Sequence, residues 1–428
     1  MRPSRRGALL RLSLVPLLAT LACGAPEPSP SAPSEHDVHP ALLAQTAEFE
    51  PRVHSVTDRV HVAVGYALGN SILVEGTQCD FVVDVTESIE TAQEVKRAFE
   101  NLSTRPIGAL VYTHNHADHV FGARGFVPEG TVDVYANART EALVHRVVSV
   151  LRPIISARSD RMFGTLLPTE GPDRIENAGI GPALAIGHGG GTISWLPPTH
   201  TFDDRLEATI CGRSVVLVHA PGETDDQIFV WLPDERVLLP GDNVYKAFPN
   251  LYTIRGTPYR DVLRWVASLD AMRALEPDHL VMSHTRPLSG SAAIADVLTA
   301  YRDAVQFVHD QTVRGMNRGL TPDELVERVR LPEHLATHPY LQELYGTVEW
   351  SVRNIFQGTL GWFDGDAATL LPAAPAERAA GYVELAGGRE ALLAVARERL
   401  DAGHPAFAAE LAGHLLRLEP EDRAAKAG

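Results

Sequence analysis

The sequence predicts an α+β protein, because strand-like and helix-like patterns alternate along its first half and helical patterns fill its second. Short runs of alternating apolar and polar residues occupy Val60–Val64, Ser71–Val74 and Asp80–Asp84, and a period of two residues is typical of β-strands. Apolar side chains then recur at helical spacing over Thr86–Leu102, and an apolar run over Gly108–Thr113 predicts a buried strand. We therefore expect strands, a helix and a further strand at the start of the folded region.

A second group of strands is expected after residue 200, and helices after it. Between the two groups, residues 156–194 are rich in Gly, Pro and Arg and lack clear periodicity, which is typical of a segment that lines or covers a site. Helical spacing returns in residues 290–365 and in two amphipathic segments, Glu390–Leu400 and Ala406–Leu418, which resemble part of a helical hairpin repeat. The remaining expected elements are strands at Val132–Ala136, Arg205–Ile210, Ser214–Val218, Ile228–Leu232, Val237–Leu239 and His279–Ser283, and helices at Arg139–Leu151 and Tyr259–Leu275.

Length and charge narrow the class of protein. The chain has 428 residues, which is enough for two or three domains, and its 45% of hydrophobic residues can form a sizeable core. The formal net charge of −16 argues against a nucleic-acid partner, because nothing would neutralise the phosphates. The three cysteines do not form a disulfide framework, and we expect Cys79 and Cys211, both in strand-like surroundings, to be small core residues rather than a bridge.

The N-terminus has the pattern of an export signal. Residues 1–22 combine a basic head with an apolar run that is too short to span a membrane comfortably. The run Leu-Ala-Cys23-Gly resembles a bacterial lipoprotein cleavage site, so we expect either a lipid anchor on Cys23 or simple cleavage and release. Residues 24–38 are rich in Pro, Ser and Glu, and residues 24–48 are expected to form a flexible tether. These features predict an exported protein, periplasmic or anchored to the outer membrane of a bacterium.

A cluster of histidines directly follows the strand expected before residue 114. The run His114-Asn-His116-Ala-Asp118-His119 holds three imidazoles and one carboxylate. The first two histidines can converge on one metal ion and the last two side chains on a second, and this donor set suits zinc or a similar divalent metal. A polar loop that happens to be rich in His is the alternative. Asp84, at the end of an earlier strand, could orient a metal-bound His or cap its own strand.

Further candidate ligands follow other expected strands. Glu223 lies in the turn Ala-Pro-Gly-Glu-Thr, Asp242 follows a Pro-Gly pair, and His284 follows the strand expected at 279–283. Because strand ends on one rim are where layered α/β folds place their sites, we expect these side chains to meet the histidine cluster. In the first turn, Asp225 or Asp226 could be the ligand in place of Glu223.

This set of motifs resembles the metallo-β-lactamase superfamily. The signature of that family is a strand followed by H-x-H-x-D-H, then a Pro-Gly-His turn, an Asp and a His, and here Glu223 stands where the turn usually has its histidine. The resemblance implies an αβ/βα sandwich, with two facing sheets and helices outside, over residues 50–288.

The glutamate in the turn points to the alkylsulfatase branch of that superfamily. The resemblance to this branch implies that an all-α dimerisation domain follows in residues 289–372 and that the protein is a homodimer. It leaves residues 373–428 outside, as a tail that resembles a helical hairpin. The segments that carry the resemblance are Asn250–Gly256, Gln311–Leu325, Tyr345–Arg353 and Leu360–Gly365.

The resemblance implies two Zn²⁺ ions, and other divalent metals share the same ligands. Two such ions about 3.5–4 Å apart lower the pKa of a shared water and brace both the nucleophile and the leaving oxygen. Asp118 and Asp242 are therefore expected to serve catalysis as well as metal binding. The implied ligands are His114, His116 and Glu223 for one ion and Asp118, His119 and His284 for the other, with Asp242 bridging.

A sulfate ester carries a negative charge that local groups must meet. Arginine suits this task because its planar fork matches paired oxyanion oxygens. By the resemblance, Arg255 is the leading candidate, helped by Asn250 and Tyr252, and a structural salt bridge is the alternative for this arginine. Arg286, two residues after His284, is a further candidate for substrate binding.

The sequence thus predicts a metal-dependent hydrolase that cleaves an alkyl sulfate ester to an alcohol and inorganic sulfate with a metal-activated water. One alternative is another hydrolase on the same scaffold, acting on a lactam, thioester or phosphodiester. A second is a non-catalytic envelope lipoprotein that binds a partner through its helices. The presence of all seven candidate ligands argues against the second alternative.

Overall fold

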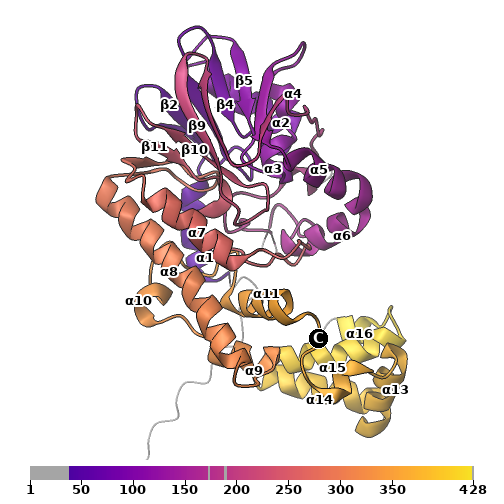
Figure 1. The fold of residues 1–428 in the computed structure, drawn as a ribbon. Helices are drawn as coiled ribbons and strands as arrows, with labels where there is room; N and C mark the ends of the chain where they lie inside the picture. Colours follow the sequence, from indigo (N-terminus) through magenta and orange to yellow (C-terminus); the bar gives the residue numbers. More distant parts are fainter. Residues whose placement is uncertain (1–37, 172–173, 188–189, 427–428) are drawn as a thin grey trace, which may run out of the picture.

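Two β-sheets face each other in the upper part of Figure 1, and helices cover both outer faces. This computed structural model describes residues 38–171, 174–187 and 190–426. The predicted αβ/βα sandwich followed by a helical region is therefore confirmed. The expected signal segment 1–22 and Cys23 lie outside the described residues.

In the described part of the chain, no helix combines the length and the apolar character that crossing a membrane requires.

The first sheet contains seven strands that lie side by side in sequence order. Its first four strands pair antiparallel, and β4 to β7 pair parallel. Helix α2 (Ile89–Phe99) makes the crossover from β4 to β5, and the Ser88 hydroxyl caps it by accepting a hydrogen bond from the Thr91 amide. The strands are β1 (Arg52–Ser55), β2 (Val60–Val64), β3 (Ser71–Glu75), β4 (Asp80–Val83), β5 (Ile107–Val111), β6 (Asp133–Asn137) and β7 (His200–Phe202).

The second sheet has six strands in the order β13-β12-β11-β10-β9-β8. All neighbours in this sheet are antiparallel except β11 and β12, which run parallel. The strands are β8 (Arg205–Ile210), β9 (Arg213–His219), β10 (Ile228–Leu232), β11 (Val237–Leu239), β12 (His279–Leu280) and β13 (Leu288–Ser289).

The main core lies between the two sheets. Val62 and Val111 from the first sheet and Val230 and Leu239 from the second belong to one fully buried cluster. A second core lies where α2 packs on the outer face of the first sheet, and a third where α7, α8 and α11 pack on the outer face of the second. Central strands such as β2 are buried over all five residues, because both faces of the sheet are covered.

Long helices follow the second sheet. Asp261 caps the start of helix α7 (Val262–Arg273), because its carboxylate accepts hydrogen bonds from two amides of the first turn. Helix α8 (Ser291–Met316) and helix α11 (Val348–Leu360) pack against each other. The other helices are α1 (Pro40–Gln45), α3 (Ala117–Val120), α4 (Ala123–Phe126), α5 (Thr140–His145), α6 (Arg152–Met162), α9 (Pro322–Arg328), α10 (Glu333–Ala336), α12 (Ala367–Leu370), α13 (Pro375–Ala386), α14 (Arg389–Asp401), α15 (Pro405–Leu418) and α16 (Arg423–Lys426), with short turns η1 (Thr46–Phe49), η2 (Arg146–Val150), η3 (Ala185–Gly187) and η4 (Gly241–Asn243).

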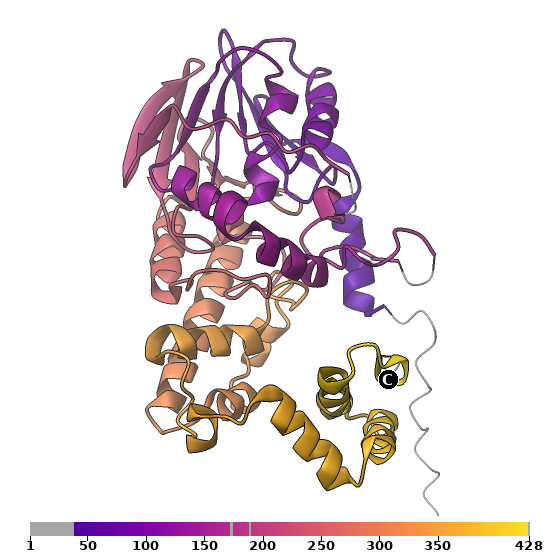
Figure 2. The same cartoon turned by 90° about the vertical axis from the view of Figure 1, so that its right-hand side faces the viewer.

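Three segments differ from the expectation. The end of the predicted tether is folded as α1, where the buried Gln45 side chain donates hydrogen bonds to the carbonyls of Gly179 and Lys246. Helix α6 occupies part of the segment that was expected to be irregular. Its residues are exposed or half-buried, so the sequence lacks the apolar stripe that would have indicated a helix. The tail contains α13 and the short α16 in addition to the two expected helices, and these helices share a small core of their own. Figure 2 shows the group, toward the yellow end of the colours, apart from the sheets.

A disulfide bond joins Cys79 to Cys211, so the expectation of two separate core cysteines was wrong. Cys79 precedes β4 and Cys211 lies in the turn between β8 and β9, so the bond connects one sheet to the other. Their Cα atoms lie 5.2 Å apart, although 132 positions separate them in the sequence. A Cβ atom at Gly108 would lie 2.5 Å from the Cys79 sulfur, so only glycine fits beside the bridge.

Cys79→Ser should lower the free energy of unfolding by about 2–5 kcal/mol, because the bond closes a long loop and restricts the unfolded chain. Denaturant unfolding of the wild type and the variant measures this difference. Reductant should lower the midpoint of the wild type and leave that of the variant unchanged. Equal midpoints without reductant would show that the bond is absent in solution.

Candidate metal centre and substrate cavity

The histidine cluster lies at the carboxyl end of β5, in the middle of the first sheet. His114 and His116 follow the strand, and the short helix α3 then carries Asp118 and His119. All four side chains are at most slightly exposed, and those of His114 and His119 are fully buried. The strand end and the single helical turn therefore aim both pairs of ligands into the protein.

Three loops of the second sheet supply the other candidates. Glu223 lies between β9 and β10, Asp242 lies in η4 after β11, and His284 follows β12. The structure brings all seven predicted ligands together in two groups that share Asp242, and within each group the ligand atoms lie within 4.8 Å of one another. The first group is His114, His116, Glu223 and Asp242, and the second is Asp118, His119, Asp242 and His284.

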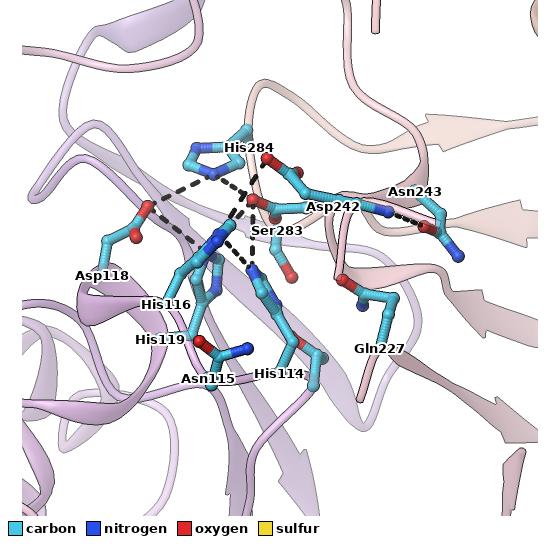
Figure 3. A network of polar contacts seen from close by, with 12 residues as sticks. His114, Asn115, His116, Asp118, His119, Gln227, Asp242, Asn243, Ser283 and His284 are labelled. Atoms are coloured by element: carbon cyan, nitrogen blue, oxygen red, sulfur yellow. Dashed lines mark hydrogen bonds and ion pairs between the residues drawn. The ribbon is translucent and has the colours of Figure 1, made fainter. Parts of the chain in front are cut away.

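Asp242 occupies the centre of the cluster, as Figure 3 shows. Its Oδ2 atom lies 3.0 Å from His284 Nε2, 3.3 Å from His119 Nε2 and 3.6 Å from His114 Nε2. Asp118 Oδ2 approaches two of the same rings, at 3.3 Å from His119 Nε2 and 3.4 Å from His284 Nε2. One carboxylate thus faces ligands of both groups, which is the position that a bridging ligand requires.

The donor set fits divalent cations. His119 Nε2, Glu223 Oε2 and Asp242 Oδ1 are buried and have no hydrogen-bond partner among the described residues. Buried carboxylates are stable when they are paired or coordinate a metal, and three of them converge here. Burial lowers the pKa of His114 and His116 well below the usual range, and the Arg255 cation adds to this effect at His116. Both rings therefore stay neutral, as metal ligands must.

Asp84 holds the cluster from behind. Its Oδ2 atom accepts hydrogen bonds from His119 Nδ1 at 2.9 Å, from the Ser283 hydroxyl at 2.8 Å and from the Thr113 hydroxyl at 2.9 Å. The residue has a φ of 58°, a left-handed conformation that few residues other than glycine and Asn or Asp adopt readily. Of the two roles that the sequence left open, the structure shows the carboxylate orienting a histidine.

Asn243 links the two turns that carry carboxylate ligands. Its side-chain oxygen accepts a hydrogen bond from the Glu223 amide at 3.1 Å, and its side-chain nitrogen donates to the Ala220 carbonyl at 2.7 Å. A Cβ atom at Gly222 would lie 2.2 Å from that oxygen, so the glycine before Glu223 makes the close approach possible. Asp225 is exposed and pairs with Arg264, so it stands outside both ligand groups.

Arg255 lies beside the metal cluster, where its Nη2 atom is 3.2 Å from His116 Nε2. The other predicted substrate-binding residues, Asn250, Tyr252 and Arg286, have other surroundings. Asn250 is fully buried, and neither polar atom of its amide has a partner among the described residues. The Tyr252 hydroxyl accepts a hydrogen bond from Arg158 at 3.4 Å. Arg286 binds the Ala47 carbonyl.

The structure directs Arg286 toward the η1 segment, and the residue lines neither of the two cavities that adjoin the metal cluster. Its guanidinium lies 3.9 Å from Glu48. The chain turns sharply after His284, where Thr285 has a φ of 64°, and this turn carries the arginine toward the η1 segment. Closeness in sequence to a ligand was therefore a misleading signal.

Sequence reasoning missed Arg260. The residue is 2% exposed, and its guanidinium donates a hydrogen bond from Nη1 to Glu223 Oε1 at 2.8 Å. Burial raises the pKa of Glu223 to about 7, and the charge of Arg260 opposes that rise. The only hint in the sequence was an arginine at the second position of the helix expected over Tyr259–Leu275, which is too common a feature to single out.

Two cavities meet at His116 and Arg255. The larger has a volume of about 300 Å³ and reaches Asp118 and Asp242. One wall is apolar, and the other is formed by α6, with Ser156 and Asp160 facing the space. The smaller, of about 90 Å³, lies on the Glu223 side. The apolar wall of the larger cavity includes Leu68, Phe121, Phe163, Ile180, Leu184 and Ile186.

Comparisons with known proteins agree with this architecture. Residues 64–284 match the metallo-beta-lactamase superfamily, and residues 321–428 match the alkyl sulfatase dimerisation domain. The second match includes residues 373–428, the tail that the sequence placed outside the resemblance. The chain is 44% identical over 364 residues to a linear primary-alkylsulfatase of Pseudomonas sp., covering 83% of this chain and 67% of that protein.

More distant relatives give the same picture. An (R)-specific secondary-alkylsulfatase of Pseudomonas sp. is 29% identical, with 90% of this chain and 58% of that protein covered. The solved structure of the stereoselective inverting sec-alkylsulfatase Pisa1 from Pseudomonas sp. superposes with a TM-score of 0.87 at 28% identity, over 91% of this chain and 63% of that one. The chain thus spans about two thirds or less of the lengths of these relatives. It belongs to the metallo-β-lactamase superfamily and, within it, to the alkylsulfatase branch.

Proposed function

We propose that this protein is a metal-dependent hydrolase that cleaves alkyl sulfate esters to an alcohol and inorganic sulfate. The observation that carries the proposal is the position of Arg255, at the junction of a buried metal-ligand cluster and a largely apolar cavity. An anionic head and an apolar chain are the two parts of an alkyl sulfate, and these are the two environments that meet here. The similarity to alkylsulfatases supports the same assignment.

The metal ions in this proposal are two divalent cations, with zinc as the first choice. The two ligand groups would hold one ion each and share Asp242. When bound, such a pair supplies Lewis acidity and lowers the pKa of water at the site. The mixture of imidazole and carboxylate suits zinc, and manganese or iron can use the same donors.

The hydrogen bonds of two histidines prepare their rings for metal binding. The Nδ1 atom of His284 lies 2.9 Å from the Leu68 carbonyl, and a carbonyl only accepts, so Nδ1 carries the proton. His119 makes the equivalent bond from Nδ1 to the Asp84 carboxylate. The carboxylates of Asp242 and Asp118 raise the pKa of both rings against the opposing effect of burial. Metal binding requires the neutral ring, and in that form the free electron pair is on Nε2, which is the atom that points into the cluster.

The substrate would be oriented by its charge and its chain. The Arg255 guanidinium can bind two sulfate oxygens, and it is fixed next to the ligand His116. The alkyl chain would then lie along the apolar wall of the larger cavity, where burial of each methylene contributes about 0.8 kcal/mol. In this arrangement the ester oxygen would lie close to the metal cluster.

We further propose that the protein is exported and acts as a homodimer. The match of residues 321–428 to a dimerisation domain supports the dimer. The bond between Cys79 and Cys211 supports export, because disulfides persist in oxidising compartments and are rare in the cytosol. A lipid anchor on Cys23, periplasmic or outer-membrane placement and a bacterial origin remain part of the proposal on sequence grounds.

Asp84→Asn should weaken metal binding about 10- to 100-fold, because it removes the carboxylate that orients His119. Asparagine tolerates the left-handed backbone at this position, so the fold should be retained. Competition with a chelator, followed by elemental analysis, measures the loss. Ser283→Ala removes one donor to the same carboxylate and should have a smaller effect. Unchanged metal affinity in Asp84→Asn would contradict the orienting role.

Arg255→Ala should lower kcat/KM for alkyl sulfates about tenfold to hundredfold, the effect of losing charge-assisted hydrogen bonds. The measurement is sulfate release by the metal-loaded enzyme, beside hydrolysis of a neutral lactam, a thioester and a phosphodiester. Any activity on the neutral lactam should survive the substitution. A wild type that hydrolyses one of these other substrates and no alkyl sulfate would establish the alternative function on the same scaffold.

Leu184→Trp should shorten the preferred alkyl chain, because the larger side chain fills part of the cavity that Leu184 lines. Exclusion of two or more methylenes predicts a loss of about tenfold or more in kcat/KM for dodecyl sulfate, with little change for short chains. Leu166→Trp is the matched control, since Leu166 is 79% exposed and lines neither cavity. An equal loss at all chain lengths would place the chain elsewhere.

A further inference from the structure

We propose that Glu87 is a positioning residue for the alkyl chain of the substrate, because its carboxylate fastens two segments of the cavity's apolar wall to each other and to the metal cluster. The inference rests on the proposed function, since it concerns the chain of the same substrate. Glu87 lines neither cavity and belongs to neither ligand group, so it would act through the residues that it holds.

Glu87 lies in the turn between β4 and α2 and is fully buried. Its Oε1 atom accepts a hydrogen bond from the Ala185 amide at 3.2 Å and another from the Leu68 amide at 3.4 Å. Burial raises the pKa of Glu87 to about 7, the charge of Asp118 adds to the rise, and the two amides oppose it. A buried carboxylate needs donors, and both of these belong to the backbone of segments far away in the sequence.

Both segments supply side chains to the apolar wall of the larger cavity. Leu68 lines that cavity, and so do Leu184 and Ile186, the two neighbours of Ala185. The three side chains pack in one apolar cluster. A Cβ atom at Gly181 would lie 2.3 Å from the Leu68 carbonyl oxygen, so glycine allows the two segments to approach closely. A single carboxylate oxygen therefore joins two parts of the wall.

Residues 182–187, here called the wall segment, have few other attachments. Within the described part of the chain, the bond from the Ala185 amide to Glu87 is the only hydrogen bond that joins the wall segment to another segment. The chain on either side is held separately, through the Gly179 carbonyl and through Thr192. Without an acceptor at Glu87, the wall segment would rest on side-chain packing alone, so its apolar side chains would lose their fixed position.

Leu68 connects this wall to the reacting end of the cavity. Its amide donates to Glu87, and its carbonyl accepts a hydrogen bond from His284 Nδ1 at 2.9 Å. One backbone unit thus links the wall to a candidate metal ligand. A chain that lies along the wall would therefore be aligned with an ester group at the metal cluster, and long chains would depend on this alignment more than short ones.

The test is kcat/KM of the metal-loaded full-length protein for butyl, octyl and dodecyl sulfate, measured as sulfate release below the concentrations at which these esters form micelles. Glu87→Met removes the oxygen acceptor and should lower kcat/KM for dodecyl relative to butyl sulfate about tenfold, the contact of about two methylenes, mainly through KM. Glu87→Gln keeps an acceptor oxygen and should retain the wild-type ratio. Glu94→Met is the matched control, since Glu94 is an exposed residue of α2 that lines neither cavity.

The dependence on chain length separates positioning of the chain from a general effect on the fold. An equal loss at all three lengths, or a wild-type ratio in Glu87→Met, would overturn the inference and leave the proposed function intact. A loss in Glu87→Gln as large as that in Glu87→Met would also overturn it, because the acceptor would not be what matters.

Metal content, measured by elemental analysis, should stay at the wild-type level in every variant. Loss of metal would show that Glu87 acts on His284 rather than on the chain, which overturns the inference. If Glu87→Met does not fold, Glu87→Asp decides by the same ratio, because its shorter side chain draws the acceptor away from the two amides. A wild type that hydrolyses none of the three alkyl sulfates would remove the proposed function as well.

Discussion

The convergence of three buried carboxylates on four buried imidazoles is the constraint on which the rest of the structure depends. Buried carboxylates are stable only when a positive charge lies close to them, and divalent cations supply that charge in a small volume. Glu223 Oε2 and Asp242 Oδ1 have no hydrogen-bond partner within the described part of the chain, which leaves both atoms available to a cation. Both sheets contribute ligands, so binding of the cations would also fasten one sheet to the other.

The fold supports this cluster by short connections at one rim of the sandwich. Strand β5 delivers the histidines, and the turns after β9, β11 and β12 deliver the remaining ligands. Asp84 fixes a ring from below, and Asn243 ties two ligand turns together. At the other side of the sandwich, the bond between Cys79 and Cys211 joins the sheets covalently. The sandwich is therefore cross-linked at the end opposite the site, and hydrogen bonds hold the ligand turns at the site itself.

The sequence revealed the parts of the site that have local patterns. The ligands from His114 to His119 lie in one short run, and Glu223 follows a Pro-Gly turn, so both could be named in advance. Contacts that depend on tertiary structure could not be named from the sequence. The pairing of Cys79 with Cys211 depends on two sheets facing each other, and the role of Arg260 depends on its approach to Glu223 across 37 positions. Arg286 was predicted to bind substrate because it is close to His284 in the sequence, but the turn after His284 directs its side chain away from the site.

Anomalous X-ray scattering from crystals of the purified protein, combined with elemental analysis, tests the central claim most directly. The account predicts two divalent ions for each chain, one in each ligand group, with Asp242 in contact with both and Glu223 within coordination distance of one. A folded protein that binds a single ion, or binds its ions without Glu223, would contradict it.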